Sequence, residues 1–416
     1  MNAVELYDIF CNCKGVTTDS RKICGGEMFF ALHGDNFDGN RFAIQALKDG
    51  AAYAVVDSAE VATSSAEYAD RLIVVEDTLA ALQSLAAYHR EQLAIPIIAI
   101  VGSNGKTTTK ELVSRVLSQR YSVYATRGNL NNHIGVPLTL LAMDNSIEFG
   151  VVEMGASAQG EIALLCSLAR PNYGIITNIG NAHLEGFGGK EGIKRGKGEL
   201  FDFLEENGSR AFVPKEDQVL VDMAAERSNM AVELYSRSIA DGYKSHLSGE
   251  YNRFNIAAAV AVATYFDIPT ERIAEAIESF IPDNNRSQEV ITAHNNTLII
   301  DCYNANPSSM EVAIENIASK HSERNLLILG DMLELGEWSH SEHCRILELA
   351  VQVKDAEIVL VGNHFLKAAH ALGIGATCCT DSTEAAEWVA QSKISDTTVL
   401  LKGSRGIALE KLIDKL

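Results

Sequence analysis

The sequence has no long hydrophobic run. None of its apolar stretches reaches the roughly 18 residues that a membrane-spanning helix needs. Its first ten residues, MNAVELYDIF, lack a basic segment and carry two acidic side chains, so they do not resemble a secretory signal peptide. We therefore expect a cytoplasmic protein that does not span a membrane.

Positive charge is also scarce. The 416 residues include 35 Lys and Arg against 55 Asp and Glu, which gives a formal net charge of −20. A surface of that sign repels the phosphates of nucleic acids over most of its area. We expect no nucleic-acid partner, and any anionic ligand has to be held by a local group of donors.

Paired cysteines and proline-rich stretches are missing as well. The eight cysteines lack the CxxC pairs of a typical zinc site, so we expect reduced and mostly buried thiols. Seven prolines and an apolar content of 47% are typical of a globular chain rather than a disordered one.

What the sequence does contain is an alternation of strand-like and helix-like segments. Four apolar runs each end in polar residues: IIAIVGSNGK, SVYATRGNLNN, FGVVEMGAS and YGIITNIGNAH. This alternation predicts an α/β fold with mostly parallel sheets, whose ligands gather at the carboxyl ends of the strands. Length and composition changes predict three domains: a smaller α/β domain at 1–93, a central domain at 94–286 and a Rossmann-like domain at 287–416.

The first of these runs ends in a phosphate-binding pattern. A standard P-loop reads G-x-x-x-x-G-K-[ST], whereas Gly102 and Gly105 give G-x-x-G-K-T-T here, with Val101 at the position of the usual first glycine. A buried strand still leads through a turn into a helix N-terminus, as phosphate binding requires. Lys106 would reach the β- and γ-phosphates, and Thr107 would place its hydroxyl on Mg²⁺. The alternative is a strand-to-helix turn with a surface lysine.

Polar side chains also end the neighbouring strands. Glu153 closes FGVVE, Asn178 and His183 follow GIIT, and Asn129 follows SVYATR. Each is weak alone, because a strand-end Glu is more often solvated and a lone histidine more often structural. Together they offer a carboxylate, amides and an imidazole beside the Lys-Thr pair, which favours a phosphate site with a metal ion. Lys197 is a surface cation unless its amine is buried, neutral and reactive.

Eight motifs resemble, in chain order, those of the Mur ligase family of peptidoglycan synthesis. They are GSNGKTTTKE, GNLNNHIGVPLTLL, EMGAS, TNIGNAHLEGFGG, KGELF, DCYNANPSSM, LGDMLELGE and KGSRG, and the resemblance runs from about Thr18 to the end of the chain. The second and sixth motifs are similar to the branch that adds D-alanyl-D-alanine to a UDP-linked muramoyl tripeptide. The others are shared more widely in the family.

The resemblance implies an ATP-dependent amide ligase, monomeric and cytoplasmic, with two Mg²⁺ ions. ATP would phosphorylate the terminal carboxylate of UDP-N-acetylmuramoyl-tripeptide, and the amine of D-Ala-D-Ala would attack the acyl phosphate. Charge builds up between two anions in such a reaction, and metal ions and fixed cations stabilise it. The expected product is the UDP-linked pentapeptide used in cell-wall biogenesis, and therefore in cell shape, cell division and the cell cycle.

The resemblance also implies residue roles by position. Residues expected to act in catalysis are Lys106, Asn129, Glu153, His183 and Lys197, with Lys197 carbamylated. Mg²⁺ ligands are expected at Thr107, Glu153, His183 and Lys197. Nucleotide contacts are expected at Gly102, Ser103, Asn104, Gly105, Lys106, Thr107, Thr108, Asn252, Asn255, Arg286, Asp301 and Tyr303. Contacts to the other substrates are expected at Ser20, Arg21, Gly34, Asp38, Gly39, Asn131, Asn132, Asn304, Asn306, Lys402, Ser404 and Arg405.

Three positions depart from the pattern of the family. Tyr251 and Asn40 stand where His is frequent, and Gly196 stands where Ala is usual. Tyr251 changes the expected adenine contacts, and Gly196 weakens its helix by about 1 kcal/mol. None of the three removes a group that the chemistry needs.

Other activities compete with this interpretation. A ligase adding a diamino acid to the UDP-dipeptide is the nearest, but DCYNANPSSM and LGDMLELGE argue against it. Folylpolyglutamate synthetase lacks a first domain like residues 18–50. A P-loop switch or a kinase would turn over nucleotide without an amine acceptor. The third residue of the peptide, meso-diaminopimelate or lysine, stays open.

Overall fold

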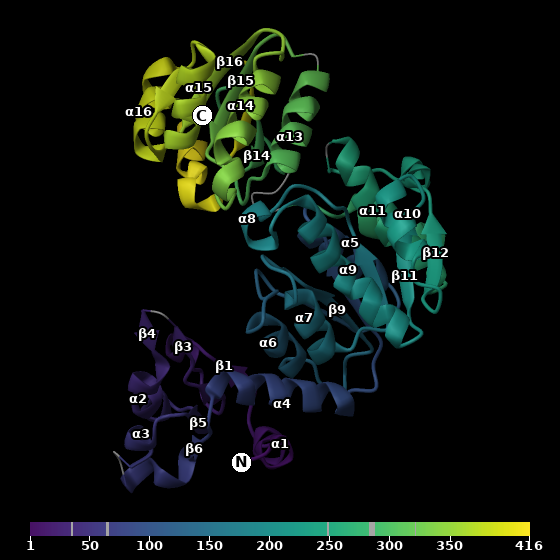
Figure 1. The fold of residues 1–416 in the computed structure, drawn as a ribbon, viewed down its shortest axis with the longest axis vertical. Helices are drawn as coiled ribbons and strands as arrows, with labels where there is room; N and C mark the ends of the chain where they lie inside the picture. The colour runs from purple at the N-terminus through teal and green to yellow at the C-terminus, as the bar shows by residue number, and fades with distance from the viewer. Residues whose placement is uncertain (35, 64–65, 248, 283–287, 321) are drawn as a thin grey trace.

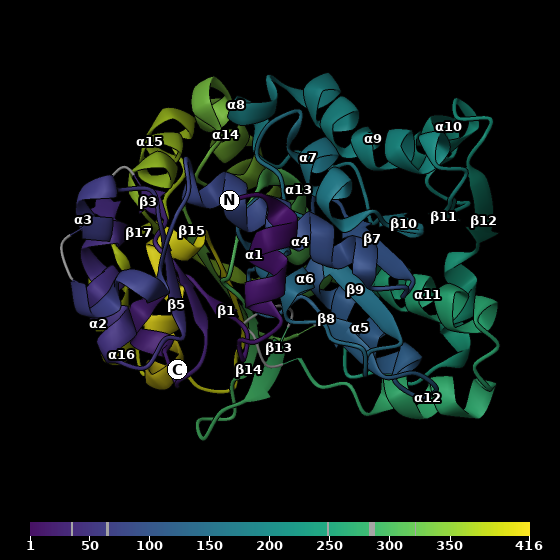
Figure 2. The ribbon, with the colours of Figure 1, turned by 90° about the horizontal axis from the view of Figure 1, so that it is seen from below.

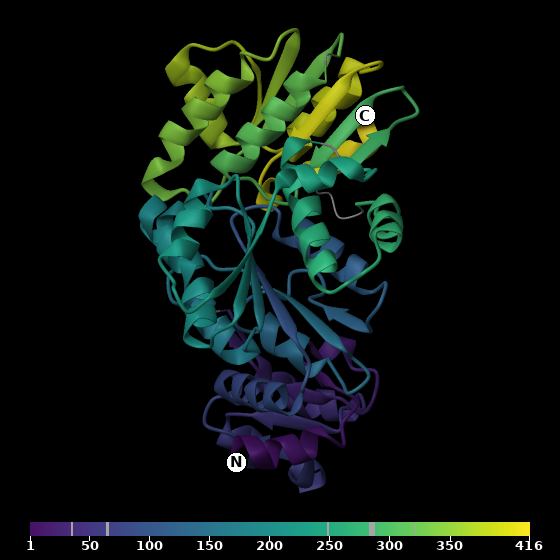
Figure 3. The ribbon, with the colours of Figure 1, turned by 90° about the vertical axis from the view of Figure 1, so that its right-hand side faces the viewer.

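Three main sheets follow one another along the chain in the computed structural model, which describes residues 1–34, 36–63, 66–247, 249–282, 288–320 and 322–416. Figures 1 and 3 show three α/β domains in a row, with the N-terminal domain at one end and the C-terminal domain at the other. This architecture confirms the predicted fold class. The limits at 93/94 and 286/287 stay predictions, and residues 283–287 lie outside the described residues.

The N-terminal domain has a parallel sheet in the order β1-β2-β5-β6. Its strands are β1 (Val16–Thr17), β2 (Met28–Phe30), β5 (Tyr53–Val56) and β6 (Leu72–Val74), and its helices are α1 (Ala3–Phe10), α2 (Ala43–Lys48) and α3 (Ala59–Thr63). A separate antiparallel hairpin is formed by β3 (His33–Gly34) and β4 (Phe37–Asp38). The hairpin is therefore attached to the domain by means other than the ladder of the main sheet.

Helix α4 (Thr78–Gln92) joins the N-terminal domain to the central one and packs against α1 on one side (Figure 2). Its other contacts are with the central helices α6 (Gly135–Leu141) and α7 (Glu161–Ala169). Gln83, His89 and Arg90 donate hydrogen bonds to carbonyls of the central domain, at His133 (3.0 Å), Met143 (2.8 Å) and Ala169 (2.7 Å). The helix is thus fixed to the central domain along its length.

The central domain is a fully parallel sheet in the order β12-β11-β10-β7-β9-β8. Its strands are β7 (Ile97–Val101), β8 (Val123–Ala125), β9 (Phe149–Glu153), β10 (Tyr173–Ile176), β11 (Arg210–Pro214) and β12 (Ala231–Tyr235). Its remaining helices are α5 (Lys106–Leu117), α8 (Leu184–Phe187), α9 (Lys190–Glu206), α10 (Gln218–Ala225), α11 (Glu250–Tyr265) and α12 (Thr270–Glu278). Strands β10, β7, β9 and β8 are neighbours and run parallel. The polar residues at their carboxyl ends therefore lie at the same edge of the sheet.

The C-terminal domain has a sheet in the order β13-β14-β18-β15-β16-β17, in which only the β13–β14 pair is antiparallel. Its strands are β13 (Gln288–Ile291), β14 (Thr297–Asp301), β15 (Asn325–Gly330), β16 (Ala356–Val361), β17 (Thr377–Cys379) and β18 (Thr398–Lys402). Helices α13 (Pro307–Ser319), α14 (Ser339–Ala350), α15 (Asn363–Leu372) and α16 (Ser382–Ser392) complete it.

The cysteines are less buried than the sequence suggested. Only Cys166, Cys302 and Cys379 are buried, so the expectation of mostly buried thiols is wrong, although all eight cysteines are free. The exposed thiols are Cys11 and Cys24, which lie between elements of the N-terminal domain, and Cys378 on the edge strand β17. Among the described residues, no helix combines the length and apolarity that crossing a bilayer would take.

Candidate active site

A cavity of about 1160 Å³ lies at the carboxyl edge of the central sheet. One wall comes from the central domain and includes Lys106, Glu153 and His183. The opposite wall comes from the C-terminal domain and includes Tyr303, Lys402 and Arg405. A space lined by two domains at a parallel-sheet edge is the expected place for ligands of an α/β protein.

The turn after β7 has the backbone that a phosphate loop needs. Gly102 has a φ of +148°, and a Cβ there would lie 1.9 Å from Thr177 Oγ1. Gly105 has a φ of +78° and is the N-cap of α5, so Lys106 is the first residue of the helix. Both positions therefore require glycine, and the first-turn amides of α5 face the cavity with the positive end of its dipole.

The loop is held in place by β10 and the segment that follows it. Ser103 Oγ donates to Gly180 O at 2.8 Å, and Asn178 Oδ1 accepts from Asn104 N at 3.1 Å. Asn178 Nδ2 and Thr177 Oγ1 both donate to Asn104 O, at 3.0 and 2.5 Å. Asn178, which the sequence offered as a phosphoryl contact, thus positions the loop and also lines the cavity, and its contact with phosphate stays a prediction. Thr177 was missed, although it stands in the TNIGNAH motif.

Lys106 and Asn129 lie at the cavity as their sequence positions suggested. Lys106 Nζ donates to Gly102 O at 2.8 Å and to Ser103 O at 3.2 Å. The ammonium therefore lies over its own loop, within reach of any phosphate that the loop amides bind. Thr108, Asn131 and Asn132 line the same wall.

Glu153 and Thr107 form an oxygen pair below the loop. Glu153 is 1% exposed, and its Oε2 accepts from Thr107 Oγ1 at 2.9 Å while its Oε1 accepts from Asn131 Nδ2 at 2.7 Å. Within the described part of the chain, no three His, Cys, Asp and Glu side chains gather as a preformed metal site. Mg²⁺ commonly uses one or two carboxylates, water and substrate phosphates, so a carboxylate with a hydroxyl beside a phosphate loop fits this ion.

His183 contacts a carboxylate from the other domain. It precedes α8 in the left-handed region, with a φ of 55°, and its Nδ1 lies 2.5 Å from Glu334 Oε2. Glu334 also has a positive φ, 64°, and the close contact with the His183 imidazole lowers the pKa of its carboxyl. Glu334 was missed in the sequence, where only its motif LGDMLELGE was noted.

Lys197 is buried rather than exposed. The residue is 2% exposed on α9, and its Nζ lies 5.2 Å from the centre of the Phe187 ring. Burial, followed by the charge of Lys106, lowers the pKa of its amine to about 7. A substantial neutral fraction near neutral pH fits the reactive amine that carbamylation requires. The side chain does not line the cavity.

The proposed adenine side of the cavity is built on α11. Tyr251, Phe254 and Asn255 line it, whereas Asn252 is buried behind it. Asn255 Oδ1 accepts from Thr109 Oγ1 at 3.1 Å, and its Nδ2 donates to Asn252 Oδ1 at 2.9 Å. These amides therefore connect α11 to α5. Arg286, expected near the nucleotide, lies outside the described residues.

The C-terminal wall contains two cationic side chains, Lys402 and Arg405, which differ in their exposure to solvent. Lys402 is 1% exposed, and its Nζ contacts Asp301 Oδ2 and Asn304 O, both at 2.8 Å. Arg405 is exposed and its guanidinium carbon lies 5.2 Å from the centre of the Tyr303 ring. Arg405 is thus the more accessible cation for an anionic ligand. Asp301, Tyr303 and Asn304 also line the cavity.

Asn306 and Ser404 do not line the cavity. Asn306 caps α13 by accepting from Ser309 N at 2.9 Å, and its Nδ2 donates to Asn104 Oδ1 at 2.8 Å across the domain boundary. Ser404 is buried, and its Oγ accepts from Leu333 N at 3.0 Å. Their direct contact with substrate stays a prediction, and the hydrogen bonds that the structure shows for them are all to other residues of the protein.

The predicted residues of the N-terminal domain lie away from this cavity. Ser20 and Arg21 are in a short 3₁₀ helix, where Arg21 Nε pairs with Asp19 Oδ1 at 2.8 Å. This pair lowers the pKa of the Asp19 carboxyl to about 2. Gly34, Asp38 and Gly39 lie in and after the β3–β4 hairpin. The structure therefore separates the predicted sites into a cavity group and a hairpin group.

Comparison with known families and proteins agrees with this arrangement. Three family models match in succession: the Mur ligase family catalytic domain at 12–90, the Mur ligase middle domain at 100–244 and the Mur ligase glutamate ligase domain at 285–405. The UDP-N-acetylmuramoyl-tripeptide–D-alanyl-D-alanine ligase of Bacillus subtilis is 34% identical, covering 97% of this chain and 93% of its own. The chain belongs to the Mur ligase family. It is therefore an ATP-dependent ligase, as the motifs predicted.

Two further proteins support the membership in this Mur ligase family. The enzyme of the same name from Escherichia coli strain K12 is 33% identical, covering 99% of this chain and 95% of its own. A crystal structure of MurF from Acinetobacter baumannii has a TM-score of 0.86 and 30% identity, covering 100% of this chain and 98% of that chain. The Mur ligase fold thus extends over all three domains.

Proposed function

We propose that this Mur ligase joins D-Ala-D-Ala to the terminal carboxylate of UDP-N-acetylmuramoyl-tripeptide in the cytoplasm, as a monomer. The observation that carries the proposal is a single cavity with a phosphate loop on one wall and an accessible cation, Arg405, on the other. The names of the similar full-length proteins from B. subtilis and E. coli point to the same substrates.

The reaction has two steps that this cavity is suited to bring together. A tripeptide carboxylate oxygen attacks the γ-phosphorus of ATP, ADP leaves, and an acyl phosphate forms. The dipeptide amine then attacks the acyl carbon, loses a proton, and expels phosphate as the amide forms. Both steps bring anions together, so fixed donors and cations lower the barrier.

The central wall would bind and orient the phosphates. The amides of Gly105 and Lys106 and the ammonium of Lys106 would face the transferred group, with Asn129 on the same wall of the cavity. Tyr251 and Asn255 would border the base. These groups would keep the γ-phosphate in line with the tripeptide carboxylate.

Mg²⁺ would be held by Thr107 and Glu153, with a second ion at His183 and a carbamate on Lys197. The ions would supply neutralisation of charge between the carboxylate and the phosphates. The buried amine of Lys197, with its pKa of about 7, supports carbamylation because only a neutral amine reacts with CO₂. A carbamate would also convert a cation into the oxygen ligand that Mg²⁺ prefers.

The two other substrates would occupy separate regions. Arg405 would pair with the carboxylate of D-Ala-D-Ala, because the Lys402 ammonium is already paired with Asp301. The UDP end would bind at the N-terminal domain, near Ser20, Arg21 and the hairpin residues Gly34, Asp38 and Gly39. The tripeptide would then extend from the hairpin toward the phosphate loop.

The proposal is tested by phosphate release from ATP and Mg²⁺ with UDP-N-acetylmuramoyl-tripeptide, with and without D-Ala-D-Ala. We expect release that depends on the dipeptide, together with a UDP-pentapeptide detected by mass spectrometry. Release that is indifferent to the dipeptide would contradict the ligase assignment and favour a switch or kinase. Light scattering of the same sample checks the monomer.

A further inference from the structure

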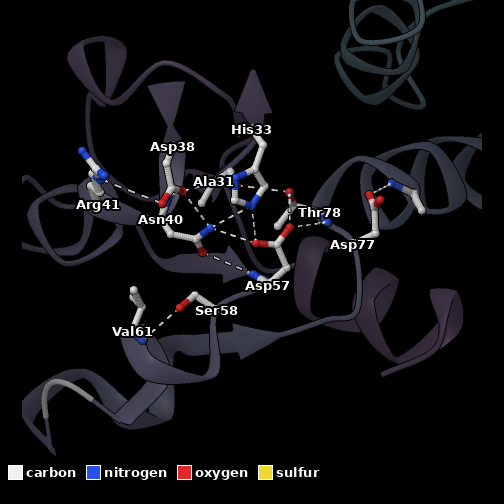
Figure 4. A network of polar contacts seen from close by, with 11 residues as sticks. Ala31, His33, Asp38, Asn40, Arg41, Asp57, Ser58, Val61, Asp77 and Thr78 are labelled. Atoms are coloured by element: carbon white, nitrogen blue, oxygen red, sulfur yellow. Dashed lines mark hydrogen bonds and ion pairs between the residues drawn. The ribbon is translucent and has the colours of Figure 1, made fainter. Parts of the chain in front are cut away.

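A polar network in the N-terminal domain is not used by the reaction as described above. We call it the Asp57 network; it consists of His33, Asp38, Asn40, Asp57 and Thr78 (Figure 4). Asn40 and Thr78 are each 2% exposed, so most of the network is shielded from water. His33 and Asp38 are the members that reach solvent, with 51% and 38% of their side chains exposed.

The Asp57 carboxylate is the centre of this network. Its Oδ1 accepts from Asn40 Nδ2 at 2.8 Å and lies 2.6 Å from His33 Nε2. Its Oδ2 accepts from Thr78 N at 3.2 Å and from Thr78 Oγ1 at 3.1 Å. A carboxylate that is 12% exposed needs such donors to stay ionised. Burial raises the pKa of its carboxyl, but the hydrogen bonds outweigh burial and the pKa is lowered.

The network joins the β3–β4 hairpin to the start of helix α4. His33 and Asp38 belong to the β3–β4 hairpin, and Asn40 follows it, whereas Thr78 is the first residue of α4. Strands of two residues are too short to be stable alone, and this hairpin is a sheet separate from the main one. The place of the hairpin therefore depends on the Asp57 network and on the adjoining backbone, where Gly39 N donates to Leu32 O at 2.9 Å.

Helix α4 carries this attachment to the cavity. Five residues beyond Thr78, Gln83 donates to the carbonyl of His133 at 3.0 Å. His133 lines the cavity beside Asn131, whose amide holds Glu153. Hydrogen bonds, helix α4 and the backbone of residues 131–133 thus connect the hairpin to the wall that carries the phosphate loop.

We propose that Asp57 is a positioning residue for the UDP end of the substrate. By fixing the hairpin to the start of α4, it sets the distance between the UDP-binding end and the phosphate loop. It touches no substrate and acts through the hairpin. The inference rests on the proposed function, because it needs a substrate that spans both regions.

The test compares Asp57→Asn with a matched control, Asp77→Asn, in the full-length enzyme. Asparagine keeps the size of Asp57 but replaces one acceptor oxygen by a donor that faces the donors of Thr78 or His33. We expect the KM for UDP-N-acetylmuramoyl-tripeptide to rise ~10-fold, while kcat and the KM for ATP change less than ~2-fold. Asp77 is the adjacent N-cap of α4, accepting from Ala80 N at 2.7 Å, and Asn caps equally well, so the control should match the wild type.

A second measurement separates positioning from folding. Calorimetric titration with UDP alone should show weaker binding to Asp57→Asn than to the wild type, with ADP binding equal. If Asp57→Asn fails to fold, His33→Gln decides instead, because it removes one exposed donor; we expect its KM for the UDP substrate to rise ~3-fold.

Two other kinds of outcome would contradict either the positioning role of Asp57 or the proposed function, and they can be told apart. An unchanged KM in folded Asp57→Asn, or an equal loss in kcat and in the KM values of all substrates, overturns the positioning role and leaves the proposed function intact. A wild-type protein that neither binds UDP nor uses the UDP-tripeptide contradicts the proposed function itself, and the inference fails with it.

Discussion

The two walls of the cavity are built in different ways. The central wall is fixed from within its own domain: Thr107 and Asn131 hold Glu153, and Asn178 holds the phosphate loop. The C-terminal wall reaches the loop through contacts that cross the domain boundary. Asn306 donates to Asn104 at 2.8 Å, and Ser308 Oγ accepts from Asn181 N at 2.8 Å.

This difference suggests that the central wall carries out the chemistry, whereas the C-terminal wall controls how the cavity is assembled. Donors fixed within one domain need no reorganisation when charge develops, which is the arrangement that stabilises a phosphoryl-transfer transition state. Contacts that cross a boundary exist only while the domains are together, so they influence how often the cavity is complete. Changes in the central wall should therefore lower kcat, and changes in the crossing contacts should mainly alter substrate affinity and compactness.

The largest effect is expected for Lys106→Met. Removing the ammonium over the loop takes away a cation at the transferred phosphate, and we expect kcat to fall by about 10³-fold. Steady-state phosphate release measures the change. Lys110→Met is the control, one turn further along α5: Lys110 Nζ donates to Thr126 O at 2.7 Å inside the domain. It should lose thermal stability and retain most of its kcat, and equal kcat losses in both variants would contradict the comparison.

The next effect is expected for Glu153→Gln. The amide keeps the shape of the side chain but not its charge, so the Mg²⁺ requirement should rise and kcat should fall by about 10²-fold. Titration of activity with Mg²⁺ measures both. Glu148 stands at the opposite end of the same strand, exposed, and accepts from Ser122 N at 2.8 Å. Glu148→Gln should leave the Mg²⁺ dependence unchanged.

The central wall was the part that the sequence made most predictable. The apolar run 97–101 predicted a central strand, and the structure shows that this strand is buried throughout. The glycines and Lys106 that follow it predicted the phosphate loop. Glu153 could be placed because it ends a similar run. The short strands β1 and β17 were not predicted, since two or three residues carry no clear alternation.

The crossing contacts were much less predictable. Glu334 lies 2.5 Å from His183 only because two domains meet there, and nothing in either local sequence specifies that meeting. Asn306 was predicted as a substrate contact from its motif, whereas its amide caps α13 and holds Asn104. The Asp57 network likewise joins segments far apart in the sequence. Side-chain partners of this kind depend on tertiary structure rather than on periodicity.

Lys197, which is buried outside the lining of the cavity, tests whether a group of the central domain costs stability. Lys197→Met should lower kcat by ~30-fold if the residue supplies a metal ligand. The folded pKa of the amine, about 7, lies below the unfolded value of 10.5. Between these values the unfolded chain binds more protons, so wild-type stability should rise with pH across this window and stay constant at its lower level below about pH 7.

The methionine variant removes that dependence. In bicarbonate-free buffer near neutral pH, the central domain of Lys197→Met should unfold a few degrees above that of the wild type, since ~1 kcal/mol corresponds to roughly 2–4 °C for a domain of this size. Differential scanning calorimetry across the window measures it. Lys194→Met, three residues earlier on α9 and less buried, is the control and should follow the wild type. A wild-type profile parallel to that of Lys197→Met would contradict the buried neutral amine.

The smallest effect is expected from the crossing contacts, and it decides whether the second wall acts through assembly. Asn306→Ser keeps an oxygen that can cap α13 but is too short to reach Asn104, and Ser308→Ala removes the acceptor for Asn181 N. Together they should raise the KM for ATP by ~5-fold and leave kcat within ~2-fold, because each loses a hydrogen bond that crosses the domain boundary. Small-angle scattering should show less compaction with nucleotide and UDP-tripeptide than in the wild type. Ser309→Ala weakens the same helix cap without touching either crossing contact, so it should compact normally. If the double variant compacts like the wild type and loses kcat instead, the second wall takes part in the chemistry directly, and the division between the two walls is wrong.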